Sequence, residues 1–288
     1  MWRTCSFGVI FLCLVTGISV AYGQGNCSLK TIAGSYAFNF LGSSTLVAGQ
    51  AADHYHWNAL YAPIVGVGIM TIKPDGNATG TFWMDSGTFT TGLTAVTLPA
   101  TFSVNPDCTG VLQYPGAAPG EIVQERLLIL DNGNEIRSIL ASAETYTPTN
   151  TWISTFRRIG GACTQNKMAG SYLFSCRSIF PTPPPSPFIS VAGAALIRMD
   201  ISRDGSSTGT FMGKFGPEVV PPIPVTGLFK VNADCTAEGT LNFGIGVNSA
   251  RGVIFNEGKE GYWLPLVNDP GAVPQPYGYC DIRQITNR

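Results

Sequence analysis

The stretch "AGSYAFNF" at residues 33–40 returns at residues 169–176 as "AGSYLFSC". Apolar side chains alternate with small or polar ones in both copies, and a period of two residues predicts a β-strand with one buried face. Two further strings follow each copy in the same order: "DGNATGTFWMDSG" (75–87) matches "DGSSTGTFMGKFG" (204–216), and "FSVNPDCTG" (102–110) matches "FKVNADCTA" (229–237). The chain is therefore a tandem repeat of one structural unit.

The repeat also predicts the domain organisation. The first unit spans residues 24–160 and the second spans residues 161–288, and each has the size of an ordinary domain. Residues 1–23 have an early Arg3, an apolar run from Phe7 to Val20 and a small residue at Gly23, which is the layout of a secretory signal peptide. We therefore expect a secreted, extracellular protein, or a periplasmic or cell-surface protein if the source is bacterial.

Each unit reads as eight short alternating segments separated by turns. The predicted turns carry the Gly, Asn and Asp residues that hairpins need, at Asp75-Gly76, Asp131–Gly133, Asp204-Gly205 and Glu257-Gly258. Eight consecutive antiparallel strands leave two unpaired edges unless the sheet closes on itself. We therefore predict an all-β protein of two tandem eight-stranded up-and-down barrels, calycin-like or lipocalin-like. A β-sandwich is the competing architecture, although it usually needs Greek-key crossings.

The repeated unit resembles a known kind of protein. Its strings "GSYAF", "DGNATGT", "VNPDCTG" and "GNEIRSI", and then "GSYLF", "DGSSTGT" and "VNADCTA", are similar to a repeat of secreted bacterial proteins of unknown function. These proteins are associated with lipocalin-like barrels and, more loosely, with barrels of the allene oxide cyclase shape. The string "GKEGYWLPLV" near the end of the second unit departs from the pattern. The resemblance implies a barrel fold and carries over no catalytic residue.

Six cysteines remain after the signal peptide, and an even number in an exported chain predicts up to three disulfides. Four of them occupy equivalent positions in the two units, which favours the pairs Cys27–Cys108 and Cys163–Cys235. The alternative, Cys27–Cys163 with Cys108–Cys235, would tie the two units together.

The last two cysteines, Cys176 and Cys280, lie on the first and last predicted strands of the second unit. A disulfide between them requires these strands to be neighbours, with Tyr172 near Gln284 and Phe174 near Ile282. Such a bond would staple the seam of a closed barrel, and a Cα separation above about 7 Å would rule it out.

Charge and composition limit the classes of partner. Only 12% of the residues are charged and the formal net charge is −1, so there is no electrostatic case for nucleic acid. No second apolar stretch is long enough to predict a membrane span. Two sequons, at Asn26 and Asn77, predict glycosylation if the source is eukaryotic. We also predict that Asp75 and Asp204 cap turns, and that Glu135 and Arg157 form a cross-strand ion pair.

Catalysis and metal binding have little support in the sequence. The two histidines, His54 and His56, share one loop, and the second unit has "PTPPPSP" (181–187) there, so we predict neither a metal site nor a cofactor. The chain lacks a G-x-S-x-G nucleophile elbow. A glycosidase needs two carboxylates facing one cleft. Four glutamates are available in the first unit: Glu121, Glu125, Glu135 and Glu144. The second unit keeps only the counterpart of Glu135.

Aromatic side chains offer the other functional possibility. Alternation places a set of them inside the barrels, where they line an apolar pocket or fill the core, and the filled core is favoured: Tyr36, Phe38, Phe40, Phe102, Tyr172 and Phe174. We predict a secreted non-enzymatic tandem barrel that binds a small apolar ligand or an extracellular protein. The alternative is a structural or surface-matrix protein with filled barrels. A hydrolase or isomerase with its site in one barrel mouth is the third hypothesis.

Overall fold

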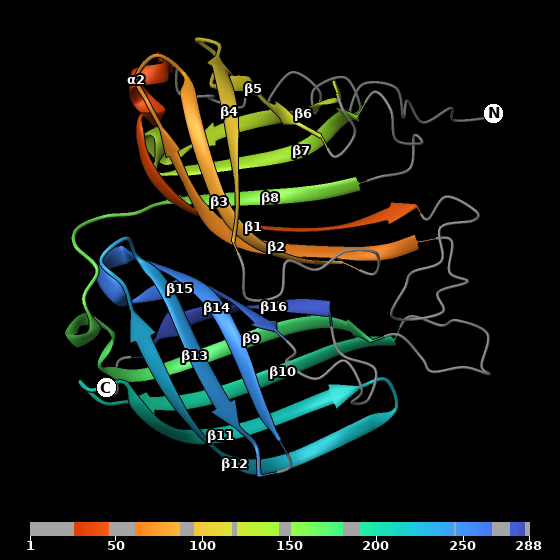
Figure 1. Cartoon of the computed structure of the whole chain (residues 1–288), viewed down its shortest axis with the longest axis vertical. Coiled ribbons are helices and arrows are strands. Elements are labelled where there is room, and N and C mark those ends of the chain that lie inside the picture. Colours follow the sequence, from red (N-terminus) through yellow and green to blue (C-terminus); the bar gives the residue numbers. More distant parts are fainter. Residues whose placement is uncertain are drawn as a thin grey trace, which may run out of the picture.

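The computed structural model describes residues 26–45, 61–86, 95–116, 120–143, 151–180, 191–244, 246–266 and 277–285. These residues form two closed antiparallel barrels of eight strands each, which confirms the predicted fold class (Figure 1). The predicted signal peptide, both histidines, Glu144 and the proline-rich loop at 181–187 lie outside the described residues.

The first barrel contains β1 (Gly34–Thr45), β2 (Tyr61–Ile72), β3 (Asn77–Ser86), β4 (Val96–Val104), β5 (Thr109–Pro115), β6 (Ile122–Leu130), β7 (Glu135–Ala143) and β8 (Thr151–Arg158). The second contains β9 (Gly170–Phe180), β10 (Val191–Ile201), β11 (Ser206–Phe215), β12 (Glu218–Val231), β13 (Thr236–Asn242), β14 (Val247–Phe255), β15 (Glu260–Leu266) and β16 (Tyr277–Gln284). Four short helical elements are α2 (Leu29–Ile32), η1 (Asp131–Gly133), η2 (Gln165–Met168) and η3 (Asn256–Gly258).

Both barrels close by pairing their first strand with their last. In the second barrel, β9 pairs with β16 in the predicted register, with Tyr172 opposite Gln284 and Phe174 opposite Ile282. Cys176 and Cys280 face each other in the same ladder and form a disulfide with a Cα separation of 3.9 Å. The other disulfides join Cys27 to Cys108 and Cys163 to Cys235, so the structure contains the three favoured pairs.

The repeated Gly-Ser-Tyr motif closes one end of each barrel. Gly34 and Gly170 both have φ of 143°, a conformation that residues with a side chain rarely adopt. The tyrosine that follows is buried, and its hydroxyl donates to the backbone carbonyl of the glycine in the distant turn. The bond runs from Tyr36 to Gly133 at 2.6 Å, and from Tyr172 to Gly258 at 2.8 Å. Burial raises the pKa of both phenols to about 12, so they remain donors at physiological pH.

We call this the turn end, because short connections join the strands there. The predicted turn residues Asp75 and Asp204 accept hydrogen bonds from the backbone amides two residues later, as expected for capping side chains. At the opposite end, which we call the loop end, most of the connections are longer in sequence, for example from Thr45 to Tyr61 between β1 and β2. Long connections on a rigid scaffold are where binding residues concentrate.

Aromatic and aliphatic side chains form one apolar cluster in the described interior of each barrel. The cluster in the first barrel includes Tyr36, Phe38, Phe102 and Phe156, and Phe40 packs against it. The cluster in the second barrel includes Tyr172, Phe174, Phe229, Met199 and Trp263. The six aromatics predicted to line the barrels therefore all belong to interior clusters. Ligand contact through them stays a prediction.

A third apolar cluster joins the two barrels. Outward-facing side chains of β1, β2 and β3 pack against those of β14 and β15, which face them in Figure 1. The buried members are Ala37, Val65, Val67, Trp83, Val253, Phe255, Tyr262 and Leu264. The interface uses the outer walls, so it leaves both barrel interiors out of the contact.

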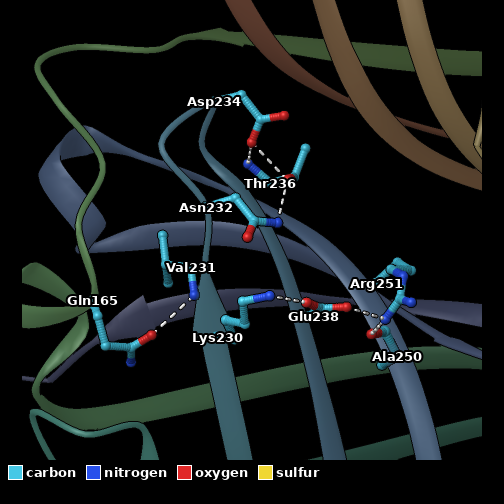
Figure 2. A network of polar contacts seen from close by, with 9 residues as sticks. All are labelled: Gln165, Lys230, Val231, Asn232, Asp234, Thr236, Glu238, Ala250 and Arg251. Atoms are coloured by element: carbon cyan, nitrogen blue, oxygen red, sulfur yellow. Dashed lines mark hydrogen bonds and ion pairs between the residues drawn. The ribbon is translucent and has the colours of Figure 1, made fainter.

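The charged residues that the two units share are mostly structural. Glu135 lies opposite Arg157 in the β7–β8 ladder, and their side chains form the predicted ion pair at 2.8 Å. The second barrel has a different set of ion pairs on its outer wall. Glu238 pairs there with Lys230 at 2.9 Å and with Arg251 at 3.3 Å (Figure 2). These ion pairs hold adjacent strands together on the outer surface and do not reach the barrel interiors.

Candidate functional site

The β4–β5 ladder of the first barrel is shorter than its counterpart in the second barrel. The backbone ladder between these strands runs from Val104 opposite Gly110 to Thr101 opposite Gln113, which makes four residue pairs. The equivalent strands β12 and β13 of the second barrel form six pairs, and their ladder continues to Thr226 opposite Asn242. The strands of the first barrel therefore separate earlier on the way to the loop end.

Two prolines explain this difference. Aligning the paired cysteines of the two units places Pro99 at the position of Thr226 and Pro115 at the position of Asn242. Proline has no backbone N–H, so neither residue can donate to a ladder between the two strands. The terminal pair that closes the wall of the second barrel cannot form in the first.

A cleft of about 540 Å³ lies at this point. Its walls combine buried alanines with exposed or half-buried hydroxyl and amide side chains, and Lys73 is its one charged residue. The lining residues are Lys73, Asn77, Ala78, Thr79, Pro99, Ala100, Thr101, Gln113, Tyr114, Pro115, Ile122 and Gln124. Most of these residues face outward from β3, β4, β5 and β6, whereas Ala78 and Ala100 belong to the interior cluster, so the cleft touches the interior cluster at those two alanines.

The carboxylate of Glu125 lies behind Tyr114 and is only 3% exposed. Its Oε1 accepts hydrogen bonds from the Tyr114 hydroxyl and from Trp152 Nε1, both at 2.8 Å. Its Oε2 accepts from the hydroxyls of Ser154, at 3.3 Å, and Ser138. Three strands, β5, β7 and β8, thus converge on one buried carboxylate carried by β6.

All four donors to Glu125 are neutral. Within the described part of the chain, no arginine or lysine forms an ion pair with this carboxylate. Burial raises the pKa of Tyr114 well above its usual range, and the negative charge and hydrogen bond of Glu125 raise it further. The Tyr114 phenol therefore stays protonated and keeps donating to the carboxylate.

Aromatic rings lie on the same inner face as this carboxylate. Phe40 stands opposite Ser154 in the β1–β8 ladder. The Phe40 ring is 6.0 Å from the ring of Phe82 and 6.3 Å from that of Phe38, measured between centroids. The interior near Glu125 therefore offers one polar centre beside an aromatic wall.

The second barrel has none of the groups that surround Glu125. The strand registers place Ala250 at the position of Glu125, Leu241 at that of Tyr114 and Trp263 at that of Ser138. Ala250 and Trp263 are both almost fully buried. At the seam, Cys280 replaces Ser154 and Cys176 replaces Phe40. The same barrel thus closes without the polar cluster, so the fold itself does not require Glu125.

The structure places three of the four glutamates considered for catalysis, and Glu144 lies outside the described residues. Glu121 and Glu125 are both buried in the first barrel, and the charge of each raises the pKa of Tyr114. Glu135 instead lies on the outer wall, where it is 13% exposed and pairs with Arg137 and Arg157. No group of three or more histidine, cysteine, aspartate or glutamate side chains able to hold a metal occurs among the described residues.

Sequence reasoning misses most of this site. It treats Glu125 only as one carboxylate among four, and it does not single out Tyr114, Ser138 or Ser154. One signal is present, because Glu125 interrupts the inward apolar positions of "IVQERLLIL" (122–130). The second signal is the pair of prolines, Pro99 and Pro115, at positions where the second unit has Thr226 and Asn242.

Two further predictions concern the surface. Asn26 and Asn77 are both exposed, and glycosylation at them stays a prediction. Asn77 lines the cleft and its amide donates to Asp75 at 2.9 Å. Among the helices that the structure describes, none has the length and apolar character to cross a membrane.

Comparison with known proteins gives only distant likenesses. No protein-family model matches the chain, and no curated protein matches it. A crystal structure of a double mutant of transferrin-binding protein B from Haemophilus parasuis, a vaccine antigen, has a TM-score of 0.33 at 8% identity and covers 88% of this chain and 76% of its own. A protein of unknown function from the DUF3598 family of Nostoc punctiforme has a TM-score of 0.27 at 6% identity and covers 90% of this chain and 99% of its own. Likenesses at this level say nothing about what this chain binds.

Proposed function

We propose that this protein is an exported, non-enzymatic binding protein that takes a small molecule into its first barrel through the cleft between β4 and β5. One observation carries the proposal: Tyr114 lines the cleft and donates to the buried carboxylate of Glu125, whereas the second barrel has Leu241 and Ala250 at these two positions and a longer β12–β13 ladder. The second barrel serves as a filled structural unit. Three disulfides support export, because such bonds persist in oxidising compartments.

The energetic cost of the polar cluster supports binding over a purely structural role. Moving a carboxylate out of water is expensive unless hydrogen bonds compensate. The second barrel fills the equivalent space with Ala250 and Trp263, so an apolar solution was available to the same fold. A barrel that only had to be stable would not need Glu125. The protein could instead bind a partner protein at the loop end. Such binding would not explain why Glu125 and its four hydrogen-bond donors lie inside the first barrel.

A hydrolase in the mouth of the first barrel is the second candidate, because Glu121 and Glu125 are both buried there. Each oxygen of Glu125, however, already accepts two hydrogen bonds. A general acid or base must be free to exchange a proton with the substrate. Binding therefore accounts for the geometry better than proton transfer does.

Thr101→Trp tests the proposed entry route. Thr101 is exposed and lines the cleft, so an indole there should block it. Native mass spectrometry of the full protein purified from its source should show a small molecule bound one to one, and the variant should lose at least about nine-tenths of that occupancy. The neutral dye Nile red should bind in the same pattern if the natural ligand is lost during purification.

Leu228→Trp is the matched control. Leu228 occupies the position of Thr101 in the second barrel and is 56% exposed. This variant should keep full occupancy. Equal binding by wild type and Thr101→Trp would contradict the entry route, and a wild-type protein that carries no ligand and ignores the dye would contradict the binding function.

A further inference from the structure

We infer that the ligand is an organic amine, with a cationic ammonium group that pairs with Glu125 and an apolar or aromatic body. This inference rests on the proposed function, because it requires a small molecule to enter the first barrel. It adds the charge and chemical class of that molecule, which follow from the environment of the buried carboxylate.

The charge of Glu125 is the first step. Four neutral donors satisfy its hydrogen-bonding capacity but bring no positive charge. Attraction between opposite charges is stronger inside a protein than in water, because the surroundings screen it less. A cation that reaches this carboxylate therefore gains a strong partner, whereas an anion is repelled.

The second step is access. Tyr114 both lines the cleft and donates to Glu125 Oε1, so it links the lining of the cleft to the carboxylate. A small rotation of the phenol would free one acceptor site on Oε1 for an ammonium N–H. Charge-assisted hydrogen bonds of this kind are stronger than the neutral bond that they replace.

The third step concerns the body of the ligand. The Tyr114 phenol and the Trp152 indole both hydrogen-bond to the carboxylate through their polar edges, so aromatic side chains surround the proposed position of the ammonium group. Phe40 and Phe82 pack nearby at 6.0 Å between ring centroids and present apolar surface. Lys73, the one charged residue of the cleft lining, is exposed, and no arginine or lysine among the described residues pairs with Glu125. An aromatic or aliphatic group bearing one amine fits this arrangement.

The test compares two probes of equal size on the full protein. Phenethylamine carries the cation, and 2-phenylethanol replaces the amine by a hydroxyl. Isothermal titration calorimetry at pH 7 should show the amine binding to wild type at least about tenfold more tightly than the alcohol, as expected for a hydrogen bond between charged groups. Glu125→Gln keeps the shape and most hydrogen bonds of the site, and it should abolish this preference while leaving the alcohol affinity within about twofold.

Glu135→Gln is the charge-matched control, because Glu135 lies on the outer surface of the same barrel and should not affect either probe. Tyr114→Phe gives a second reading if Glu125→Gln does not fold. It removes one neutral donor and leaves the charge, so the preference for the amine should rise by at least about twofold.

The outcomes distinguish the two proposals. If both probes bind equally to wild type, or neither binds, or Glu125→Gln keeps the preference, the amine inference is wrong. In those cases the proposed function still stands if Thr101→Trp removes the natural ligand or Nile red. If Thr101→Trp changes no binding at all, the proposed function fails, and the amine inference fails with it.

Discussion

Replacing Trp263 by alanine should lower the free energy of unfolding of the second barrel by about 3–5 kcal/mol. The Trp263 side chain is 1% exposed, and its ring lies 5.1 Å from that of Phe229 and 6.4 Å from that of Phe174. It fills the inner space that the polar cluster occupies in the first barrel. Truncation would leave a cavity in a packed interior, and the cost of such a cavity adds to the lost burial.

Scanning calorimetry can measure this effect if the transitions of the two barrels are fitted separately, since a two-domain chain need not unfold in one step. Hydrogen exchange in β14 and β15 gives an independent reading for the second barrel. Val219→Ala is the control, because Val219 is 69% exposed and its truncation should cost at most about 0.5 kcal/mol. A loss below about 1 kcal/mol for Trp263→Ala would mean that the second barrel is not tightly filled.

Removing the seam disulfide should have the second largest effect. Cys176→Ala combined with Cys280→Ala should lower the free energy of unfolding of the second barrel by about 2–4 kcal/mol. The bond links residues 104 positions apart, so it strongly restricts the unfolded chain. The first barrel closes the same seam with Phe40 opposite Ser154 and no covalent bond, so the barrel should still fold.

Urea denaturation of this double variant, followed by hydrogen exchange in β9 and β16, measures the change at the seam itself. Exchange in β1 and β8 of the first barrel is the internal control and should stay as in wild type. An unchanged midpoint for the second barrel would show that the disulfide contributes nothing to closure.

The barrels could be predicted because their signals are local or covalent. Alternation with a period of two and turn residues such as Asp75-Gly76 specify strands and hairpins from neighbours in the sequence. Closure could be predicted because Cys176 and Cys280 lie on the first and last strands of one unit, and a disulfide demands proximity. That single pair also predicts the correct register of β9 against β16.

The role of the repeated tyrosine could not be predicted from the sequence. Tyr36 bonds to the carbonyl of Gly133, which is 97 residues away. The alternation of apolar and small residues around Tyr36 predicts that its side chain points into the barrel, and the structure confirms this. Which turn receives its hydroxyl depends on how the whole barrel closes, so the repeat indicates the motif without indicating its partner.

The candidate site depends on strand register, which the sequence reveals incompletely. Pro99 and Pro115 can each be read as signs of an unpaired strand edge. That both fall beside the same gap between β4 and β5 becomes visible only when the ladder is known. The donors to Glu125 likewise come from β5, β7 and β8, and only the closed barrel brings them together.

The aromatic residues show a different limit of sequence reasoning. Alternation correctly places Phe38, Phe102 and Phe174 inside the barrels. An inward position does not say whether the interior is hollow or filled, because that depends on the summed volume of all inward side chains. Comparing the two units is more informative, since Glu125 and Ala250 differ at one equivalent position of the same fold.

A crystal structure of the full protein soaked with phenethylamine tests the central claim most directly. The account predicts one bound molecule in the first barrel, with its amine nitrogen within about 3 Å of a Glu125 carboxylate oxygen and its ring toward the cleft between β4 and β5. It predicts none inside the second barrel, where Trp263 fills the space. Density only in the second barrel or only on the outer surface, or a first barrel whose β4–β5 ladder is closed as far as Pro99, would contradict it.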